Sequence, residues 1–209
     1  MSTQVKFSRV EEPYEGLRSR KKAKTRLMIE DAALRLFAEQ GYEATTVEQI
    51  AAEVEISTTT FFRYFPSKAD VVLCHQDANM PELREAILAY PPGESDLSAV
   101  QHAIDLVWVP SADPVHSHRA GLAVATSASL RGLYNDMSRN WLEGIAQALA
   151  ERRGLSVPDD EAMITSRVAL GVFNEAVRAW GNNGYKPDVG SMVAKAFATL
   201  RQLSARWAN

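Results

Sequence analysis

One segment near the amino terminus constrains the fold more strongly than any other part of the chain. Residues 45–68 contain two short stretches with helical apolar spacing, separated by a few polar residues. Thr45 or Thr46 precedes the first stretch, and each is followed three residues later by a glutamate or a glutamine, which is the spacing of a helix capping box. Ser57 precedes the second stretch and is a favourable capping residue. The segment therefore predicts two short helices joined by a tight turn.

The second of these helices has the composition of a helix that reads DNA. Three threonines open it, and aromatic residues and an arginine follow. In a helix-turn-helix the second helix lies in the major groove, and its first residues contact the base edges. A threonine hydroxyl can donate or accept a hydrogen bond there, and its methyl group can contact a thymine methyl. We therefore expect Thr58, Thr59 and Thr60 to face the bases of double-stranded DNA.

The charge distribution is compatible with DNA binding at one end of the molecule. The whole chain has a formal net charge of −3, which by itself disfavours a nucleic-acid partner. Residues 18–26, however, hold a run of arginines and lysines with no acidic residue among them. Such a patch on an otherwise acidic protein fits a DNA-reading end and a body that DNA repels. Lys22 and Arg26 are the expected DNA contacts in this run, and a solvated helix start is the alternative.

The remainder of the chain is predicted to be all-α, with about nine helices in total. Apolar residues recur at three- and four-residue spacing, and proline- or glycine-containing segments separate the periodic stretches. No alternating run that would make a strand and no internal repeat is present. The helices are expected over residues 18–40, 47–54, 58–65, 68–89, 97–109, 116–134, 137–153, 159–180 and 189–207.

Composition and missing motifs disfavour several classes of protein. A single cysteine, Cys74, cannot form an intramolecular disulfide or, alone, a structural zinc site. No run approaches the roughly 20 apolar residues of a membrane span, and the first ten residues do not read as a signal peptide. No nucleophile elbow, phosphate loop or dinucleotide fingerprint is present. We therefore expect a cytoplasmic protein without a membrane partner that is not an enzyme and has no metal or cofactor.

Residues 21–75 resemble the tetracycline-repressor (TetR) family of transcriptional regulators. The resemblance implies a helix-turn-helix DNA-binding domain over residues 18–66, and a larger helical domain over residues 67–209 that binds a ligand and dimerises. Residues 1–17 would form a flexible arm. The positions that carry the resemblance are Ala32, Ala33, Leu36, Phe37, Gly41, Tyr42, Thr45, Thr46, Val47, Ile50, Ala51, residues 60–65 and Lys68.

The resemblance also implies which residues contact the DNA backbone. The first motif helix would begin beside a phosphate, where backbone N–H groups and the helix dipole attract anions. The end of the recognition helix and the start of the next helix would reach further phosphates, and such contacts set the register of the protein on DNA. The residues expected in these roles are Thr46, Val47, Arg63, Tyr64 and Lys68, the last as a phosphate clamp.

Two positions depart from the family pattern. Phe62 stands where tyrosine is common, so the aromatic face is kept and a hydroxyl that could bond a phosphate is lost. Glu55 stands in the turn where the family usually has glycine, because the backbone there requires a positive φ. A non-glycine residue in that conformation costs on the order of 1 kcal/mol, which does not overturn the motif.

The second domain is expected to enclose a ligand pocket between its helices, because it holds many bulky apolar residues and few polar ones. An apolar or amphipathic effector is expected, and an anionic end on it would be met by Arg119 or Arg178. The alternative is that these aromatic residues are ordinary core. The predicted pocket residues are Trp108, Arg119, Tyr134, Met137, Trp141, Phe173, Asn174 and Arg178.

The last two helices are predicted to form a homodimer interface. One has a stripe of small residues and the other a stripe of bulky ones, so that two helices from each of two chains would make a four-helix interface about a two-fold axis. The alternative is that both stripes are buried within one chain. The stripes are Ala162, Val168, Ala169, Val172, Ala176 and Ala179, and Val189, Met192, Val193, Ala196, Phe197, Leu200, Leu203 and Trp207.

Together these features predict a ligand-responsive, sequence-specific transcriptional repressor that acts as a homodimer on a palindromic DNA operator. An activator, or a regulator of the same fold without an effector, is the main alternative. Two alternatives come from other classes of protein. One is a helical enzyme that kept an ancestral DNA-binding head, and the other is a helical scaffold that binds another protein.

Overall fold

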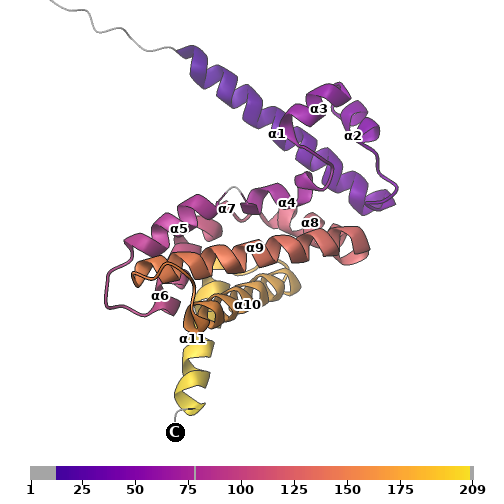
Figure 1. Cartoon of the computed structure of the whole chain (residues 1–209). Helices are drawn as coiled ribbons and strands as arrows, with labels where there is room; N and C mark the ends of the chain where they lie inside the picture. The colour runs from indigo at the N-terminus through magenta and orange to yellow at the C-terminus, as the bar shows by residue number, and fades with distance from the viewer. Residues whose placement is uncertain (1–12, 78, 208–209) are drawn as a thin grey trace, which may run out of the picture.

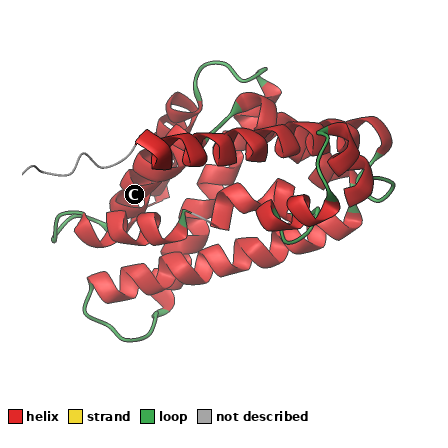
Figure 2. Cartoon of the chain, turned by 90° about the horizontal axis from the view of Figure 1, so that it is seen from above, coloured by secondary structure: helices red, strands yellow, loops and turns green. Residues whose placement is uncertain are grey.

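The computed structural model describes residues 13–77 and 79–207, and in these ranges it contains helices and connecting segments without a strand (Figure 2). The predicted all-α fold is therefore confirmed. The helices are α1 (Pro13–Gln40), α2 (Val47–Glu53), α3 (Thr58–Tyr64), α4 (Asp70–Asp77), α5 (Met80–Ala89), α6 (Asp96–Ala103), the π-helical segment η1 (Ile104–Trp108), α7 (Val109–Ser111), α8 (Pro114–Thr126), α9 (Ala128–Arg152), α10 (Asp160–Asn182) and α11 (Val189–Trp207).

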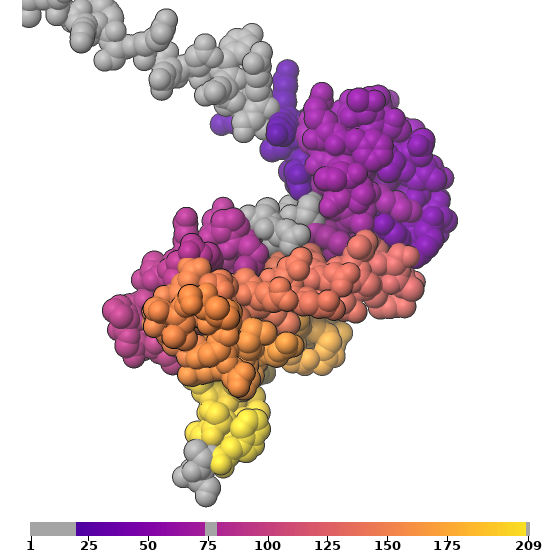
Figure 3. Space-filling model, in the orientation of Figure 1, coloured from indigo at the N-terminus to yellow at the C-terminus, as the bar shows by residue number. Residues whose placement is uncertain are grey.

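The first three helices form a head that lies against one end of the larger helical body (Figures 1 and 3). Its core is aromatic: the ring centroids of Phe61 and Phe65 lie 5.8 Å apart, and those of Phe37 and Tyr42 lie 5.1 Å apart in an edge-on arrangement. Phe61 and Phe65 are fully buried. These two phenylalanines therefore pack inside the head and do not face the outside of the molecule.

The local signals of the helix-turn-helix act as the sequence predicts. Thr46 is the residue that caps α2: its hydroxyl accepts from the Gln49 N–H at 3.2 Å, and the Gln49 side chain accepts from the Thr46 N–H at 2.8 Å. Ser57 caps α3. Glu55 has a φ of +54°, which confirms the predicted left-handed conformation of the turn.

The start of α1 differs from the prediction. The helix begins at Pro13, five residues before the expected start at residue 18. Proline is favourable in the first helical turn because its missing N–H would have no intrahelical partner there, so Pro13 opens the helix where a break was predicted. Residues 1–12 of the predicted flexible arm lie outside the described residues, and residues 13–17 are helical.

Two predicted helix boundaries in the body are wrong. The helix expected over residues 68–89 is divided into α4 and α5, and Pro81 lies in the first turn of α5. The break expected between Tyr134 and Met137 does not occur, because α9 runs through both. The break lies earlier, at Ser127, whose hydroxyl accepts from the Leu130 N–H at 3.1 Å and caps α9. Helix capping, not the alanine-rich composition, sets this boundary.

The head and body are joined mainly through α8 and the start of α9. Ala123 and Leu130 are buried in the same cluster as the aromatic core of the head. The Ser127 hydroxyl also donates to the Glu43 carboxylate at 2.6 Å, and this hydrogen bond lowers the pKa of Glu43. Beyond the predicted domain boundary at residue 66 the same cluster also includes Ala69, Val71 and Val72. The division into two domains stays a prediction.

The body is a bundle in which α9 and α10 are the longest members and α11 projects beyond the others (Figures 1 and 3). Its core is formed by buried apolar residues from α5, α6 and η1 on one side and from α9 to α11 on the other. The helix expected over residues 97–109 includes the π-helical turn at residues 104–108 and ends just beyond Pro110. Such turns often occur at functional sites, and this one carries Trp108.

Replacement of Phe61 by alanine should destabilise the protein by about 3 to 5 kcal/mol, because it leaves a cavity in the aromatic core of the head. Its neighbour Phe62 is 52% exposed, so Phe62→Ala should change the free energy of unfolding by about 0.5 kcal/mol or less. Urea denaturation of both variants checks the pair. Equal losses would show that the head does not depend on burial of Phe61.

Candidate DNA interface and ligand cavity

The recognition helix presents a polar leading edge and an aromatic, basic end. Ser57 holds the first turn of α3: its hydroxyl accepts from the Thr60 N–H at 3.1 Å and lies 3.0 Å from the Thr60 hydroxyl. Thr58 is half-buried, whereas Thr59 is exposed. Of the three threonines predicted to face bases, Thr59 is therefore the best placed to reach a base edge, because the hydroxyl of Thr60 already lies beside the cap.

The predicted backbone contacts surround this helix. Thr46 at the start of α2 is exposed, and Val47 is half-buried. At the end of α3 both Phe62 and Arg63 are exposed. The Arg63 guanidinium lies 5.5 Å from the centre of the half-buried Tyr64 ring. The structure thus brings the start of α2 and the end of α3 to the outer part of the head (Figure 1), although contact with DNA stays a prediction for each of them.

The two predicted contacts on α1 differ in their surroundings. Lys22 is exposed. Arg26 is half-buried: its guanidinium lies 4.6 Å from the centre of the Phe65 ring, and its Nε lies 3.0 Å from the Glu30 carboxylate. Arg26 therefore fastens α1 to the end of the recognition helix, and Lys22, one turn earlier, is the more accessible cation.

Lys68 does not have the surroundings that a phosphate clamp requires. Its ammonium donates to the backbone carbonyls of Tyr42 at 2.6 Å and Thr45 at 2.7 Å, and lies 4.2 Å from the centre of the Tyr42 ring. Burial lowers the pKa of this ammonium. Lys68 therefore holds the loop that ends at the Thr46 cap, and its predicted contact with a phosphate stays a prediction.

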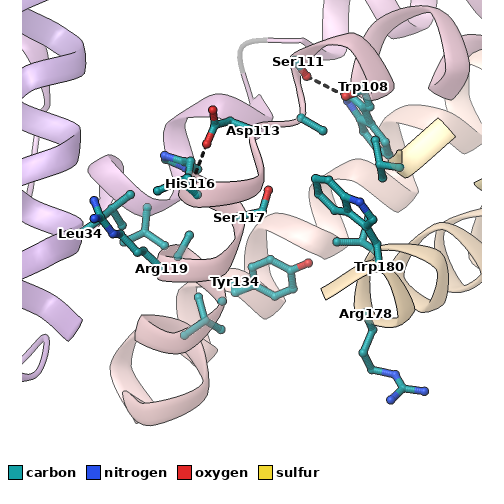
Figure 4. Close-up of a pocket in the computed structure, with 18 of the residues that line it drawn as sticks. Leu34, Trp108, Ser111, Asp113, His116, Ser117, Arg119, Tyr134, Arg178 and Trp180 are labelled. Atoms are coloured by element: carbon teal, nitrogen blue, oxygen red, sulfur yellow. Dashed lines mark hydrogen bonds between the residues drawn. The ribbon is translucent and has the colours of Figure 1, made fainter. Parts of the chain in front are cut away.

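A cavity of about 930 Å³ opens between α1, α8, α9 and α10 (Figure 4). The structure brings seven predicted pocket residues to its wall. Met137 is not among them, because it is buried in the core of the body. The seven are Trp108, Arg119, Tyr134, Trp141, Phe173, Asn174 and Arg178. The volume lies in the range of small-molecule sites, and the role of these residues in ligand binding stays a prediction.

The inner end of the cavity is aromatic. The centre of the Trp108 ring lies 5.0 Å from that of Trp141 and 4.9 Å from that of Phe173. Tyr134 and Trp180 lie across from one another in the same space (Figure 4). The indole N–H groups of Trp108, Trp141 and Trp180 are buried and have no hydrogen-bond partner among the described residues. An unpaired buried donor costs about 1 to 3 kcal/mol, and all three tryptophans also belong to the buried core of the body.

Both arginines expected to meet an anionic ligand are already paired with carboxylates. Arg119 on α8 forms an ion pair with Asp31 on α1. Arg178 donates to Glu175 on its own helix at 2.6 and 2.9 Å, and its side chain points away from the cavity (Figure 4). Each guanidinium is therefore neutralised locally, and neither is placed as an unpaired cation at the centre of the cavity.

Helix α1 contributes a wall of the cavity that was not predicted from the sequence. Leu27, Glu30, Asp31 and Leu34 recur at three- and four-residue spacing and line the cavity from the head side. The signal was present, because this spacing marks one face of a helix. It was overlooked because α1 has a second periodic face, centred on Ile29, which is buried in the head.

Helix α8 is held on both sides of the cavity. Towards the head it carries Arg119, which pairs with Asp31. Towards the end of α10 the Nδ1 of His118 lies 2.9 Å from the Tyr185 hydroxyl, and the Tyr185 ring packs edge-on against Trp180 at 4.9 Å. Helix α8 therefore contacts both the cavity and, through the Arg119–Asp31 ion pair, the head.

A second hollow follows the outer faces of α10 and α11, where the dimer interface was predicted. The two stripes are only partly buried within one chain, and the homodimer interface stays a prediction. Ala162, Ala169 and Ala176, and Val189, Val193 and Phe197, are buried within the chain. The other members remain half-buried or exposed and include Val168, Val172, Ala179, Met192, Ala196, Leu200, Leu203 and Trp207.

The described residues offer neither a candidate metal site nor a candidate membrane span. They contain no group of three or more histidine, cysteine, aspartate or glutamate side chains that could hold a metal ion. None of their helices is long and apolar enough to cross a membrane.

Comparisons with known proteins match both parts of the chain. A family model described as bacterial regulatory proteins, tetR family, matches residues 29–73, and one described as MftR C-terminal domain matches residues 97–204. The HTH-type transcriptional regulator TcmR of Streptomyces glaucescens is 34% identical over 178 residues, which cover 81% of this chain and 77% of TcmR.

Solved structures share the fold. Native NalD of Pseudomonas aeruginosa, described as the secondary repressor of the MexAB-OprM multidrug efflux pump, has a TM-score of 0.57 and 20% identity over 86% of this chain and 96% of NalD. The fatty acid degradation regulator FadR of Bacillus halodurans has a TM-score of 0.56 and 20% identity over 82% of this chain and 92% of FadR.

Replacement of Lys68 by methionine should weaken DNA binding without changing its salt dependence, because the lysine acts on the Thr46 loop and not on a phosphate. Arg63→Met, at an exposed cation, should lower the slope of log K against log salt concentration by about one. Titration of a DNA duplex at several salt concentrations checks both variants. If the slope for Lys68→Met falls as far as the slope for Arg63→Met, the result supports a direct contact between Lys68 and a phosphate.

Proposed function

Because this chain belongs to the tetR family of bacterial regulatory proteins, we propose that it is a transcriptional repressor controlled by a small molecule. It binds a palindromic operator as a homodimer and leaves it when an effector fills the cavity beside the head. One observation carries the proposal: α1 supports the recognition helix with one face and lines the cavity with another.

The exposed residues on the surface of the head would recognise DNA. Thr59, exposed at the start of α3, would contact base edges and specify sequence. Thr46, Arg63 and Lys22 would contact phosphates, which position the head without reading sequence. Lys68 and Arg26 would keep these groups in place, because their own side chains are engaged with the loop before α2 and with Phe65.

Dimerisation would use the outer faces of α10 and α11. Their half-buried and exposed apolar residues, among them Val168, Leu200 and Leu203, lie on a hollow between the two helices. A second copy of the same surface would cover them about a two-fold axis. Two heads related by that axis would then match two half-sites of a palindromic operator.

Control by an effector would pass through α8. A ligand can shift the balance between two conformations only if it binds one of them more tightly. In the described structure α8 and α1 both line the cavity, and the Arg119–Asp31 ion pair links the two helices. A ligand that displaces α8 would therefore change the orientation of the head and the spacing of the two recognition helices. The site of action is the cytoplasm, and the partners are DNA, a second copy and the effector.

Selection of bound duplexes from a random DNA pool tests the proposal, followed by titration of the selected site. Thr59→Ala should cost about 1 to 3 kcal/mol on the selected operator and little on random DNA, because it removes a base contact. Tyr64→Ala should weaken binding to both. Recovery of no palindromic sequence from folded protein would reject an operator-binding repressor in favour of the scaffold or enzyme readings.

The dimer can be tested separately. Leu203→Glu should convert the protein to a monomer, because it places a charge in the centre of an apolar interface. Val157→Glu is a matched control, since Val157 is an exposed residue in the connection before α10. Sedimentation equilibrium gives the mass of each variant. A dimer that survives Leu203→Glu would exclude this face as the interface.

A further inference from the structure

We propose that the hydrogen bond between Ser127 and Glu43 fixes the angle at which the body presents the head to DNA, and so determines which spacing of the two operator half-sites the dimer accepts. Both are positioning residues, because Ser127 is buried and the Glu43 carboxylate is held by it. This role rests on the proposed function, since half-site spacing matters only to a dimer on a palindromic operator.

Ser127 is a fully buried polar residue at the joint between α8 and α9. Its N–H donates to the Ala123 carbonyl at 3.1 Å and ends α8, and its hydroxyl accepts from the Leu130 N–H at 3.1 Å and begins α9. The single proton of that hydroxyl is donated to the Glu43 carboxylate at 2.6 Å. The point where two helices of the body meet is therefore tied to one side chain of the head.

The bond to Glu43 is of the stronger, charge-assisted kind, because its acceptor is an ionised carboxylate. The hydrogen bond from Ser127 lowers the pKa of Glu43, and the positive charges of Lys68 and Arg131 lower it further. Glu43 is an exposed residue, so packing does not set the direction of its side chain. The contact with Ser127 does so instead.

The loop between α1 and α2 carries Glu43 and is braced from within the head. The Lys68 ammonium donates to the carbonyls of Tyr42 and Thr45, which lie on either side of Glu43 along the chain. Thr46, the next residue, caps α2. A displacement of Glu43 would therefore be passed on to the start of α2, where a phosphate contact is predicted, and would not be absorbed within the loop.

The same joint also borders the cavity. Val124 and Ala125 in the last turn of α8 line the cavity, and Val124 also packs against the buried cluster of the head. The Arg119–Asp31 ion pair is a second attachment of α8 to the head. Because a helix rises about 1.5 Å per residue, the attachments at residues 119 and 127 lie roughly 12 Å apart. Two separated attachments fix an orientation, whereas one alone leaves a pivot.

The orientation of each head sets the distance between the two recognition helices. In a two-fold dimer, a rotation of the head relative to the body occurs in both subunits, so its effect on that distance is doubled. One base pair inserted between half-sites moves them apart by about 3.4 Å and turns one against the other by about a tenth of a helical turn. A firmly held head fits one spacing, and a pivoting head also fits the neighbouring ones.

Operators with altered centres test this role. The selected palindrome is compared with two versions in which one base pair is inserted at the centre or removed from it, and each duplex is titrated with the full-length protein. The wild type should bind the original at least about tenfold more tightly than either version. Glu43→Ala should reduce this discrimination about fivefold. The loss of a negative charge changes binding to all three duplexes alike, so the ratio does not report it.

Matched variants separate the hydrogen bond from the charge. Glu43→Gln removes the same charge but keeps an oxygen that can accept from Ser127, so it should retain most of the discrimination. Glu39→Ala is the control, because Glu39 is an exposed glutamate that pairs with Arg35 on the same helix. Ser127→Ala should act like Glu43→Ala, and the double variant should lose no more than the larger single loss, because both changes remove one bond. Circular dichroism checks that each variant is folded.

The role is overturned if the wild type binds the three spacings equally or if Glu43→Ala keeps the wild-type discrimination. It is also overturned if Glu43→Gln or Glu39→Ala loses as much as Glu43→Ala, or if the losses of the two single variants multiply in the double variant. Protein that selects a palindrome but gives one of these results refutes only the positioning role. Protein that selects no palindrome refutes the proposed function.

Discussion

The structure depends on the two faces of one helix. On one face of α1, Ile29 and Phe37 pack against the aromatic core that holds the recognition helix. On the other, Leu27 and Asp31 form the wall of the cavity. Protein interiors are close-packed, so α1 cannot move on one side without a response on the other. This single helix therefore contributes to both the head and the cavity.

Several charged side chains in this protein connect one structural element to another. Arg26 joins α1 to Phe65, Lys68 holds the carbonyls before α2, and Arg119 joins α8 to α1. Exposed ion pairs contribute little to stability, but each of these contacts links two elements of the head or joins the head to the body. Their value lies in orientation, and this explains why several cations expected at a ligand or a phosphate are engaged within the protein.

Much of the head could be predicted because its signals are local. Thr46 and Ser57 cap the helices that follow them, and Glu55 adopts the conformation that the turn requires. Phe61 and Phe65 are buried as their spacing indicates. Local signals did not predict the helix boundary at Ser127, where tertiary packing sets the end of α8. The Ser127 hydroxyl caps α9 and also donates a hydrogen bond to Glu43 in the head. Residues far apart in sequence meet there, and no periodic pattern contains that information.

For the cavity, the sequence by itself determined the residue types: bulky aromatic groups with a few polar ones on helical faces, seven of which reach the wall. Only the tertiary structure decided what those residues face. It placed Asp31 beside Arg119 and turned Arg178 outward, and it brought a face of α1 to the site. The reason is physical: helical periodicity sets which side chains share a face, whereas the charge that an ionised group meets depends on how helices distant in sequence pack together.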